Sequence, residues 1–203
     1  MYDGFCMKEA LKRVLASRQR LTLSDQKLTE AAVLIPIFCK DGEYHILFTQ
    51  RSEKVRQHTG QISFPGGGRH KSDATLQDTA LRESREEIGL KVRDVEVVGE
   101  LDDTPTTTSG FRISPFVSFI PYPYEFKLSH FEITEIFNVP ISTLMNKVNK
   151  RKEFYTFGDK VFEGYSYEYE GRVIWGATAK IVQQLLEVWK EACRGYKRTH
   201  LSR

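Results

Sequence analysis

Three glutamates in one short segment, Arg82-Glu-Ser-Arg-Glu-Glu-Ile-Gly-Leu90, place the strongest constraint on this chain. The apolar residues around them recur with a helical period, and Gly89 is typical of a helix C-cap, so we expect a helix here. On that helix Glu83, Glu86 and Glu87 occupy positions i, i+3 and i+4, and their carboxylates share one face. Because like charges one turn apart repel each other, this face needs either a positive partner or free access to solvent.

A group of carboxylate oxygens is the ligand set that Mg²⁺ or Mn²⁺ prefers, which makes this face a candidate metal site. Arg82 is placed to pair with Glu86 and offsets part of the repulsion. The alternative is a solvated charged face without a function. In the adjacent run Phe64-Pro-Gly-Gly-Gly68 we expect a strand to end and a rigid turn to follow. This run favours the metal site, because glycines let the main chain approach a phosphate or a cation closely. This run is not a P-loop, since His70 rather than glycine precedes Lys71.

Composition limits the class of protein. The chain has 203 residues, of which 40% are hydrophobic and 12% aromatic, enough for one domain with a buried core. The net charge of +3 comes without a long basic block, so the sequence predicts no nucleic-acid partner. The distant cysteines Cys6, Cys39 and Cys193 predict neither disulfides nor a zinc site. The longest apolar run, 31–39, is too short to cross a bilayer, so we expect a cytoplasmic protein with no membrane partner.

The hydrophobic pattern predicts an α/β chain in which strands and helices are mixed, without the regular alternation of a doubly wound sheet. One expected hairpin carries Tyr165, Tyr167 and Tyr169 on one face of its second arm. These tyrosines either pack against the protein or stack on an adenine. The expected strands are 31–39, 44–51, 60–64, 92–101, 111–120, 136–139, 154–157 and 161–169, and the expected helices are 1–20, 73–88 and 176–193.

The segment from Gly68 to Leu90 resembles the Nudix box, the signature of a family of hydrolases. That box reads Gly, five residues, Glu, seven residues, Arg-Glu, an apolar residue, any residue, Glu-Glu, any residue, Gly and an apolar residue. Ala74 stands at the first glutamate position, with Asp73 beside it, and Ser84 replaces the first apolar residue. The matching residues are Gly68, Arg82, Glu83, Glu86, Glu87, Gly89 and Leu90.

A second match narrows the resemblance to the coenzyme A diphosphatase branch of this family. The branch pattern reads Leu-Leu-Thr-x-Arg-Ser, three residues, Arg, three residues, Gly, three residues, Phe-Pro-Gly-Gly. Only Phe48 departs from it. The branch also tends to lack the first glutamate of the box, as this chain does at Ala74. The matching segments are Leu47-Phe-Thr-Gln-Arg-Ser52, Arg56, Gly60 and Phe64-Pro-Gly-Gly67, followed by 110–115 and 175–179.

The resemblance implies a fold and a reaction. The fold is the Nudix α/β/α sandwich with a mixed sheet, expected over residues 31–195, after an N-terminal helical extension over 1–30 and with a C-terminal helix. The reaction is hydrolysis of the diphosphate bond of coenzyme A or its thioesters to 3′,5′-ADP and a 4′-phosphopantetheine product. The alternatives are hydrolysis of another nucleoside diphosphate derivative such as ADP-ribose, or nucleotide binding without cleavage. The chain is expected to be a monomer or a homodimer.

The resemblance also assigns roles to individual residues. Arg82 is expected to hold the carboxylates in place, and a later acid, Glu132 or Glu135, is the candidate general base; the alternative is that both acids belong to a charged surface turn. Guanidinium groups match phosphate oxygens, which makes arginines candidate substrate contacts. The implied ligands of Mg²⁺ or Mn²⁺ are Glu83, Glu86, Glu87 and the backbone carbonyl of Gly67 or Gly68. The candidate substrate-binding residues are Arg51, Arg56, His58, Gly66 and Gly67. The alternatives are a charge at a strand end for Arg51 and a structural role for His58.

Overall fold

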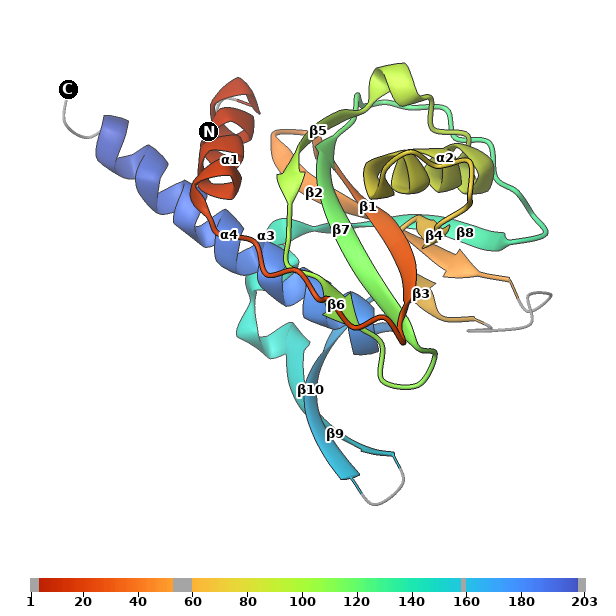
Figure 1. The fold of residues 1–203 in the computed structure, drawn as a ribbon. Coiled ribbons are helices and arrows are strands. Elements are labelled where there is room, and N and C mark those ends of the chain that lie inside the picture. The colour runs from red at the N-terminus through yellow and green to blue at the C-terminus, as the bar shows by residue number, and fades with distance from the viewer. Residues whose placement is uncertain (1–3, 53–59, 158–159, 201–203) are drawn as a thin grey trace.

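Strand β1 (Thr29–Lys40) is the central element of a mixed sheet that lies between helices (Figure 1). The computed structural model describes residues 4–52, 60–157 and 160–200. The helices are α1 (Gly4–Ser17), α2 (Leu76–Ile88), α3 (Ile141–Met145) and α4 (Gly176–His200), with short 3₁₀ helices η1 (Val92–Asp94) and η2 (Lys147–Asn149). The other strands are β2 (Glu43–Arg51), β3 (Ile62–Ser63), β4 (Gly66–Gly68), β5 (Glu96–Glu100), β6 (Thr104–Pro105), β7 (Phe111–Phe119), β8 (Ile133–Pro140), β9 (Lys150–Phe157), β10 (Lys160–Tyr169) and β11 (Arg172–Ile174).

Both edges of β1 are paired, and one edge changes its partner along the strand. β7 runs parallel to β1 along residues 29–37. On the other edge, β4 pairs antiparallel with residues 31–33 and β2 pairs antiparallel with residues 37–40. Pro36, which has no N–H to donate, falls in the interval between these two partners. β1 therefore holds the glycine strand β4 and the longer strand β2 in one sheet.

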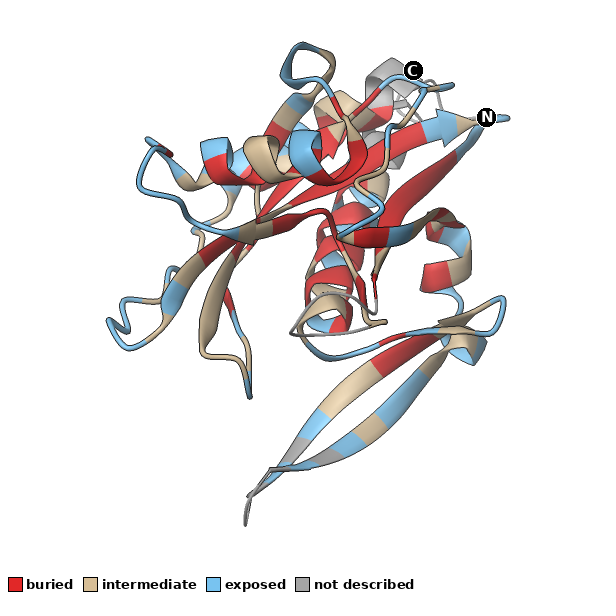
Figure 2. Cartoon of the chain, turned by 90° about the vertical axis from the view of Figure 1, so that its right-hand side faces the viewer, coloured by how far each residue is buried: buried red, intermediate tan, exposed pale blue. Residues whose placement is uncertain are grey.

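Helix α2 covers one face of the sheet, and α1 and α4 cover the other (Figure 1). Along β1 the side chains alternate between the two faces, as in any strand. Ala32 and Leu34 pack under α2, whereas Ile35 and Ile37 belong to the core on the α4 side. Figure 2 shows buried residues concentrated along the inner strands and the inner sides of the helices. The expected α/β/α sandwich with a mixed sheet is confirmed.

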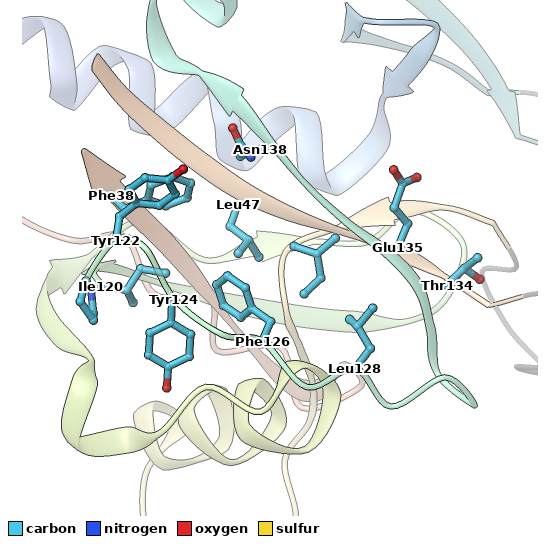
Figure 3. Close-up of a pocket in the computed structure, with 12 residues that line it drawn as sticks. Phe38, Leu47, Ile120, Tyr122, Tyr124, Phe126, Leu128, Thr134, Glu135 and Asn138 are labelled. Atoms are coloured by element: carbon cyan, nitrogen blue, oxygen red, sulfur yellow. The ribbon is translucent and has the colours of Figure 1, made fainter. Parts of the chain in front are cut away.

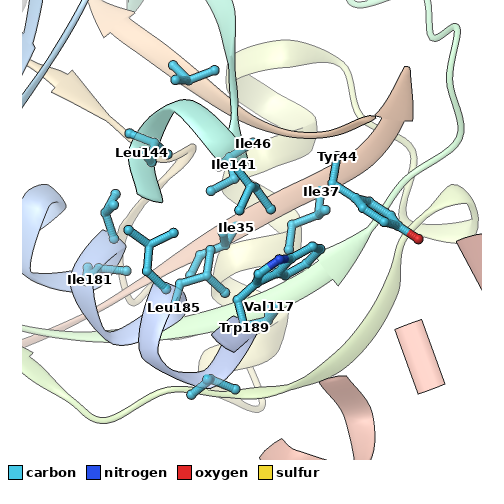
Figure 4. Packing of buried hydrophobic residues seen from close by; sticks show 14 of the residues in the cluster. Ile35, Ile37, Tyr44, Ile46, Val117, Ile141, Leu144, Ile181, Leu185 and Trp189 are labelled. Carbon is cyan, nitrogen blue, oxygen red and sulfur yellow. The ribbon is translucent and has the colours of Figure 1, made fainter. Parts of the chain in front are cut away.

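The core on the α4 side is the larger of the two (Figure 4). Trp189 of α4 meets Tyr44 edge-on, with their ring centroids 5.1 Å apart. Helix α1 packs against α4 and β5 and contributes Met7 and Leu11 to the same core. The stripe predicted for the C-terminal helix is buried, and its members are Ile181, Leu185, Val188 and Trp189.

A smaller antiparallel sheet of β9, β10 and β11 extends away from the main sheet beside α4 (Figure 1). Tyr167 of β10 is buried in the core against α4, whereas Tyr165 and Tyr169 are half-buried. Of the two alternatives for the tyrosine face, Tyr167 follows the one in which it packs against the protein. The turn expected between β9 and β10 falls on residues 158–159, which lie outside the described residues. Within the described part of the chain, none of the helices combines the length and hydrophobicity that a membrane span needs.

Three local predictions differ from the structure. The segment predicted as a strand from residue 92 begins with η1, and β5 starts only at Glu96. The strand predicted at 136–139 already begins at Ile133, because it pairs with β2 over that length. The glycine run was expected to form a turn after Pro65, which is wrong: Gly66–Gly68 form β4. Its pairing with β1 overrides the weak intrinsic strand preference of glycine.

A network of charged groups holds the segment between α1 and β1 to the sheet. Its centre is Asp103, whose side chain is fully buried. Arg20 Nη2 donates to Asp103 Oδ1 at 2.6 Å, Ser114 Oγ donates to the same oxygen at 2.7 Å, and the Leu23 N–H donates to Oδ2 at 2.9 Å. Burial by itself opposes ionisation of this carboxyl, but these donors outweigh it and lower the pKa of Asp103. The ionised form of Asp103 therefore stabilises the fold.

We expect Asp103→Asn to lower the free energy of unfolding by about 1.5–3 kcal/mol at pH 7, because it removes charge-assisted hydrogen bonds. The folded pKa lies below the unfolded value of about 3.9, so this contribution is complete above about pH 5 and is lost as the pH falls through the folded pKa. Urea unfolding of both proteins should show the gap narrowing below about pH 4. Glu125→Gln, which changes an exposed carboxylate, is the control. A gap of constant size down to pH 3 would contradict a role for the charge.

Candidate active site

Helix α2 is fixed at both ends by local sequence. Thr75 is the N-cap: its hydroxyl accepts from the Asp78 N–H at 3.1 Å, and the Asp78 carboxylate accepts from the Thr75 N–H at 2.9 Å. This reciprocal pair is a capping box. Gly89 ends the helix with a φ of 69°, in the left-handed region that favours glycine. Ser84, which departs from the apolar residue of the Nudix box, is buried, and its hydroxyl donates to the Ala80 carbonyl at 2.7 Å.

Glu87 is the most deeply buried acid on α2, with 1% of its surface exposed. Its Oε2 accepts from the Gly66 N–H at 3.0 Å, and its Oε1 lies 3.6 Å from Arg51 Nη1. Burial raises the pKa of Glu87 to about 8, and the Gly66 N–H and the Arg51 charge oppose this rise only in part. Glu87 is thus a carboxylate that lacks sufficient positive charge around it.

Glu83 lies directly against the glycine strand. A Cβ added to Gly67 would be 2.7 Å from Glu83 Cδ and 2.8 Å from each of its carboxylate oxygens. Arg82 Nη1 donates to Glu83 Oε1 at 2.7 Å. Burial raises the pKa of Glu83 despite Arg82, and the charges of Glu86 and Glu132 add to the rise. Only glycine at position 67 leaves room for this carboxylate.

Arg82 is held by Asp73 in a two-pronged ion pair. Its Nε donates to Asp73 Oδ1 and its Nη2 donates to Asp73 Oδ2, both at 2.9 Å. The guanidinium, together with the His70 N–H and the Thr79 hydroxyl, keeps the pKa of the buried Asp73 well below its usual range. Asp73 therefore orients Arg82. It supplies an anchoring carboxylate beside Ala74, the residue that replaces the first glutamate of the box.

The third acid of the box is in a different environment. The side chain of Glu86 is 47% exposed, and its Oε2 accepts from Arg82 Nη1 at 3.0 Å. The three box glutamates therefore share one helix face but differ in depth. Over residues 4–52, 60–157 and 160–200, no three His, Cys, Asp or Glu side chains are grouped closely enough to hold a metal ion by themselves.

Two of the predicted substrate contacts, Arg51 and Gly66, lie beside Glu87. Arg51 lies beside Glu87, and its Nε is buried without a hydrogen-bond partner among the described residues. The N–H of Gly66 is engaged by Glu87, and the carbonyl of Gly68 accepts from Arg82 Nη2 at 3.2 Å. The predicted contacts Arg56 and His58 lie outside the described residues.

The two candidate general bases occupy different positions on the chain leading into and along β8. The charge of Glu132 contributes to the raised pKa of both Glu83 and Glu87, so Glu132 lies within electrostatic range of these acids. Glu135 instead accepts from Arg172 Nη2 at 2.6 Å.

A groove of about 420 Å³ lies on the α2 face of the sheet (Figure 3). Its lining is mainly aromatic and aliphatic, and Tyr122, Tyr124 and Phe126 form one wall, whereas Glu135 stands at its edge. The segment that forms this wall is bound to the end of α2, where the Ser129 N–H donates to the Glu87 carbonyl at 2.8 Å. The groove therefore adjoins the helix that carries the acids.

Sequence reasoning missed three features of this site: the anchoring role of Asp73, the bond from the Gly66 N–H to Glu87, and the groove. The position of Asp73 was visible as a residue beside Ala74, and its spacing to Arg82 was the available signal. The other two features depend on segments far apart in the sequence, such as 64–68 and 121–128, and no local pattern indicates them.

Comparisons with known proteins agree with this geometry. Residues 28–153 match the NUDIX domain family. The Nudix hydrolase NudL of Citrobacter koseri is 37% identical over 184 residues, which are 90% of this chain and 94% of that protein. NudL of Escherichia coli strain SMS-3-5 is 32% identical over 185 residues, which are 91% of this chain and 95% of that protein. The chain therefore belongs to the Nudix family, and it is a Nudix hydrolase.

The fold comparison points the same way. The crystal structure of a MutT/nudix family protein from Enterococcus faecalis is similar with a TM-score of 0.52 at 12% sequence identity. The similarity covers 94% of this chain and 76% of that chain, so it includes the helices outside the family match. At this identity the likeness is one of fold alone.

Nudix hydrolases use divalent metal ions, and the donor chemistry here fits such an ion. Burial raises the pKa of both Glu83 and Glu87, and Arg51 is 3.6 Å from the nearer carboxylate oxygen of Glu87. A bound divalent cation would be the largest positive charge in the site and would favour the ionised form of both acids. Carboxylate and main-chain oxygens are the ligands that Mg²⁺ and Mn²⁺ prefer.

We expect Gly67→Ala to lower the rate of diphosphate hydrolysis about 100-fold, because the new Cβ would displace the Glu83 carboxylate and misplacement by about 1 Å has effects of that size. Gly68→Ala is the matched control, since a Cβ there meets nothing within 4 Å. The measurements are turnover and the thermal unfolding midpoint of each variant. Equal turnover in the two variants would show that the position of the Glu83 carboxylate does not limit the reaction.

Proposed function

We propose that this Nudix hydrolase cleaves the diphosphate bond of coenzyme A or its thioesters, with Mg²⁺ or Mn²⁺, to 3′,5′-ADP and a 4′-phosphopantetheine product. The observation that carries the proposal is the position of Arg51 beside Glu87. Arg51 belongs to the pattern that resembles the coenzyme A diphosphatase branch, and Glu87 belongs to the Nudix box. The buried Arg51 Nε has no hydrogen-bond partner among the described residues and lies next to a buried carboxylate, an arrangement that suits a substrate with phosphate groups.

In this proposal the side chains of the box act as a set. Glu83 and Glu87, with Glu86 and the main-chain carbonyl of Gly67, would hold the metal ion, which would supply positive charge to the phosphate oxygens and lower the pKa of bound water. Arg82 keeps Glu83 and Glu86 in position through its own ion pair with Asp73.

Recognition and proton transfer fall to residues on other elements. Arg51 binds a diphosphate oxygen and orients the bond to be cleaved. Glu132 accepts the proton of the attacking water, because its charge acts on Glu83 and Glu87, whereas Glu135 is paired with Arg172. The groove on the α2 face offers room for the part of the substrate beyond the diphosphate.

The test of this function is a comparison of substrates. With Mn²⁺ present, we expect the highest kcat/KM for coenzyme A, a lower value for 3′-dephospho-coenzyme A and the lowest for ADP-ribose, with 3′,5′-ADP as the product identified by chromatography. Glu87→Gln should abolish all three activities, which excludes a contaminating enzyme, whereas the exposed substitution Glu191→Gln should change none. A clear preference for ADP-ribose would instead favour the alternative, a Nudix hydrolase of another nucleoside diphosphate derivative.

We expect Glu132→Gln to lower kcat by about 10²–10⁴, the range of general acid–base catalysis, with a smaller effect on KM. Glu135→Gln is the comparison, since it breaks a part-buried ion pair with Arg172 that takes no part in the proton transfer, and it should change kcat by less than about threefold. Steady-state kinetics with coenzyme A measure both variants. The reverse result, a large loss in Glu135→Gln alone, would assign the general base to Glu135.

A further inference from the structure

A second pocket, of about 370 Å³, lies on the opposite side of the molecule from the acids of α2. It is formed where η2 and the first residues of β9 approach β10 and the middle of α4. Its floor includes Tyr167, which is buried, and its walls include Lys147, Lys150 and Lys190. The pocket shares no lining residue with the groove on the α2 face.

The charges of this pocket are unbalanced. Among the described residues, none of Lys147, Lys150 and Lys190 forms an ion pair, although Lys152 at the rim pairs with Glu163 at 2.8 Å. The one carboxylate in the lining is that of Glu187, which accepts from Gln183 Nε2 at 3.3 Å. Three ammonium groups therefore surround a cavity that contains a single acid.

Lys150 is the central group of this set. Its Nζ lies 3.6 Å from the ring centroid of Tyr165 and 6.0 Å from that of Tyr167, so two aromatic faces hold the ammonium in place. Burial and the nearby charge of Lys190 lower the pKa of Lys150. An anion between the ammonium groups of Lys150 and Lys190 would relieve this repulsion.

We propose that this pocket binds a small phosphate-bearing anion, with Lys147, Lys150 and Lys190 as its ligands and the Tyr165 ring as the support of Lys150. Lysine ammonium groups bind phosphate as point charges, and three of them around one cavity suit a group with several anionic oxygens. The volume falls within the range of small-molecule pockets.

The surroundings favour a small anion over a nucleic acid. A polymer needs a track of unpaired positive charges along its backbone. On the neighbouring hairpin, Arg151 pairs with Glu168 at 2.6 Å and Lys152 pairs with Glu163 at 2.8 Å, so these two cations do not extend the positive charge of the pocket along β9. The occupant is thus a compact anion that is distinct from the molecule cleaved at α2.

The test is calorimetric titration of the full chain with inorganic diphosphate, with EDTA present so that no divalent metal contributes. We expect Lys150→Gln/Lys190→Gln to weaken binding roughly tenfold or more, since it removes two of the three charges that hold the anion. Lys180→Gln, an exposed lysine of α4 outside the pocket, and Arg51→Gln, at the acids of α2, should each retain this binding. Lys150→Arg keeps the charge and should also retain it.

The proposal is overturned by any of four results: no binding of diphosphate by the wild-type chain at millimolar concentration, unchanged affinity in the double variant, an equal loss in Lys180→Gln, or loss in Arg51→Gln alone. A twelve-base oligonucleotide that binds more tightly than diphosphate and depends on the same lysines would also overturn it in favour of a polymer. Lys190→Gln alone guards against misfolding, since Lys190 is exposed, and should weaken binding on its own.

Discussion

Strand β4 and helix α2 approach each other closely because the strand consists of glycines, and the site follows from that contact. A Cβ on Gly66 would lie 2.3 Å from the Ala32 carbonyl oxygen, and one on Gly67 would lie 2.7 Å from Glu83 Cδ. Without side chains in the way, the Gly66 N–H reaches the Glu87 carboxylate at 3.0 Å. β1 holds β4 by pairing and packs under α2 at the same time, so one strand fixes both sides of the contact.

Electrostatics divides the molecule into two unlike faces. On the α2 face, burial raises the pKa of Glu87 to about 8. By contrast, the hydrogen bonds from the Arg82 guanidinium keep the pKa of Asp73 well below its usual range. Among the residues that the structure describes, the carboxylates on this face exceed the cations that face them, which suits a metal ion. On the α4 face, Lys150 and Lys190 face a cavity with one acid, which suits an anion. The sheet lies between the acids of α2 and the lysine pocket, so a metal ion at the acids and an anion in the pocket would not compete for the same space.

Much of the fold was predictable because local pattern and tertiary environment agree. The apolar stripe that ends in Trp189 is buried, as the helical period of the sequence predicts. The box helix ends at Gly89, as the sequence also predicts. Strand β4 was not predictable, because glycine has little strand preference and only the pairing with β1 makes Gly66–Gly68 a strand. Asp73 was noticed only for its position beside Ala74, and its hold on Arg82 required the loop before α2 to fold back.

The sequence by itself determined the box helix, its three acids, the glycines beside it and the family to which these belong, because each is a local spacing of residue types. Only the tertiary structure decided how the acids differ. It buried Glu87 while it left Glu86 half-exposed, set Arg51 next to Glu87 from another strand, and enclosed the lysine pocket beneath a separate hairpin. These features depend on contacts between distant segments, and the free energy of burying a charge is set by all that surrounds it.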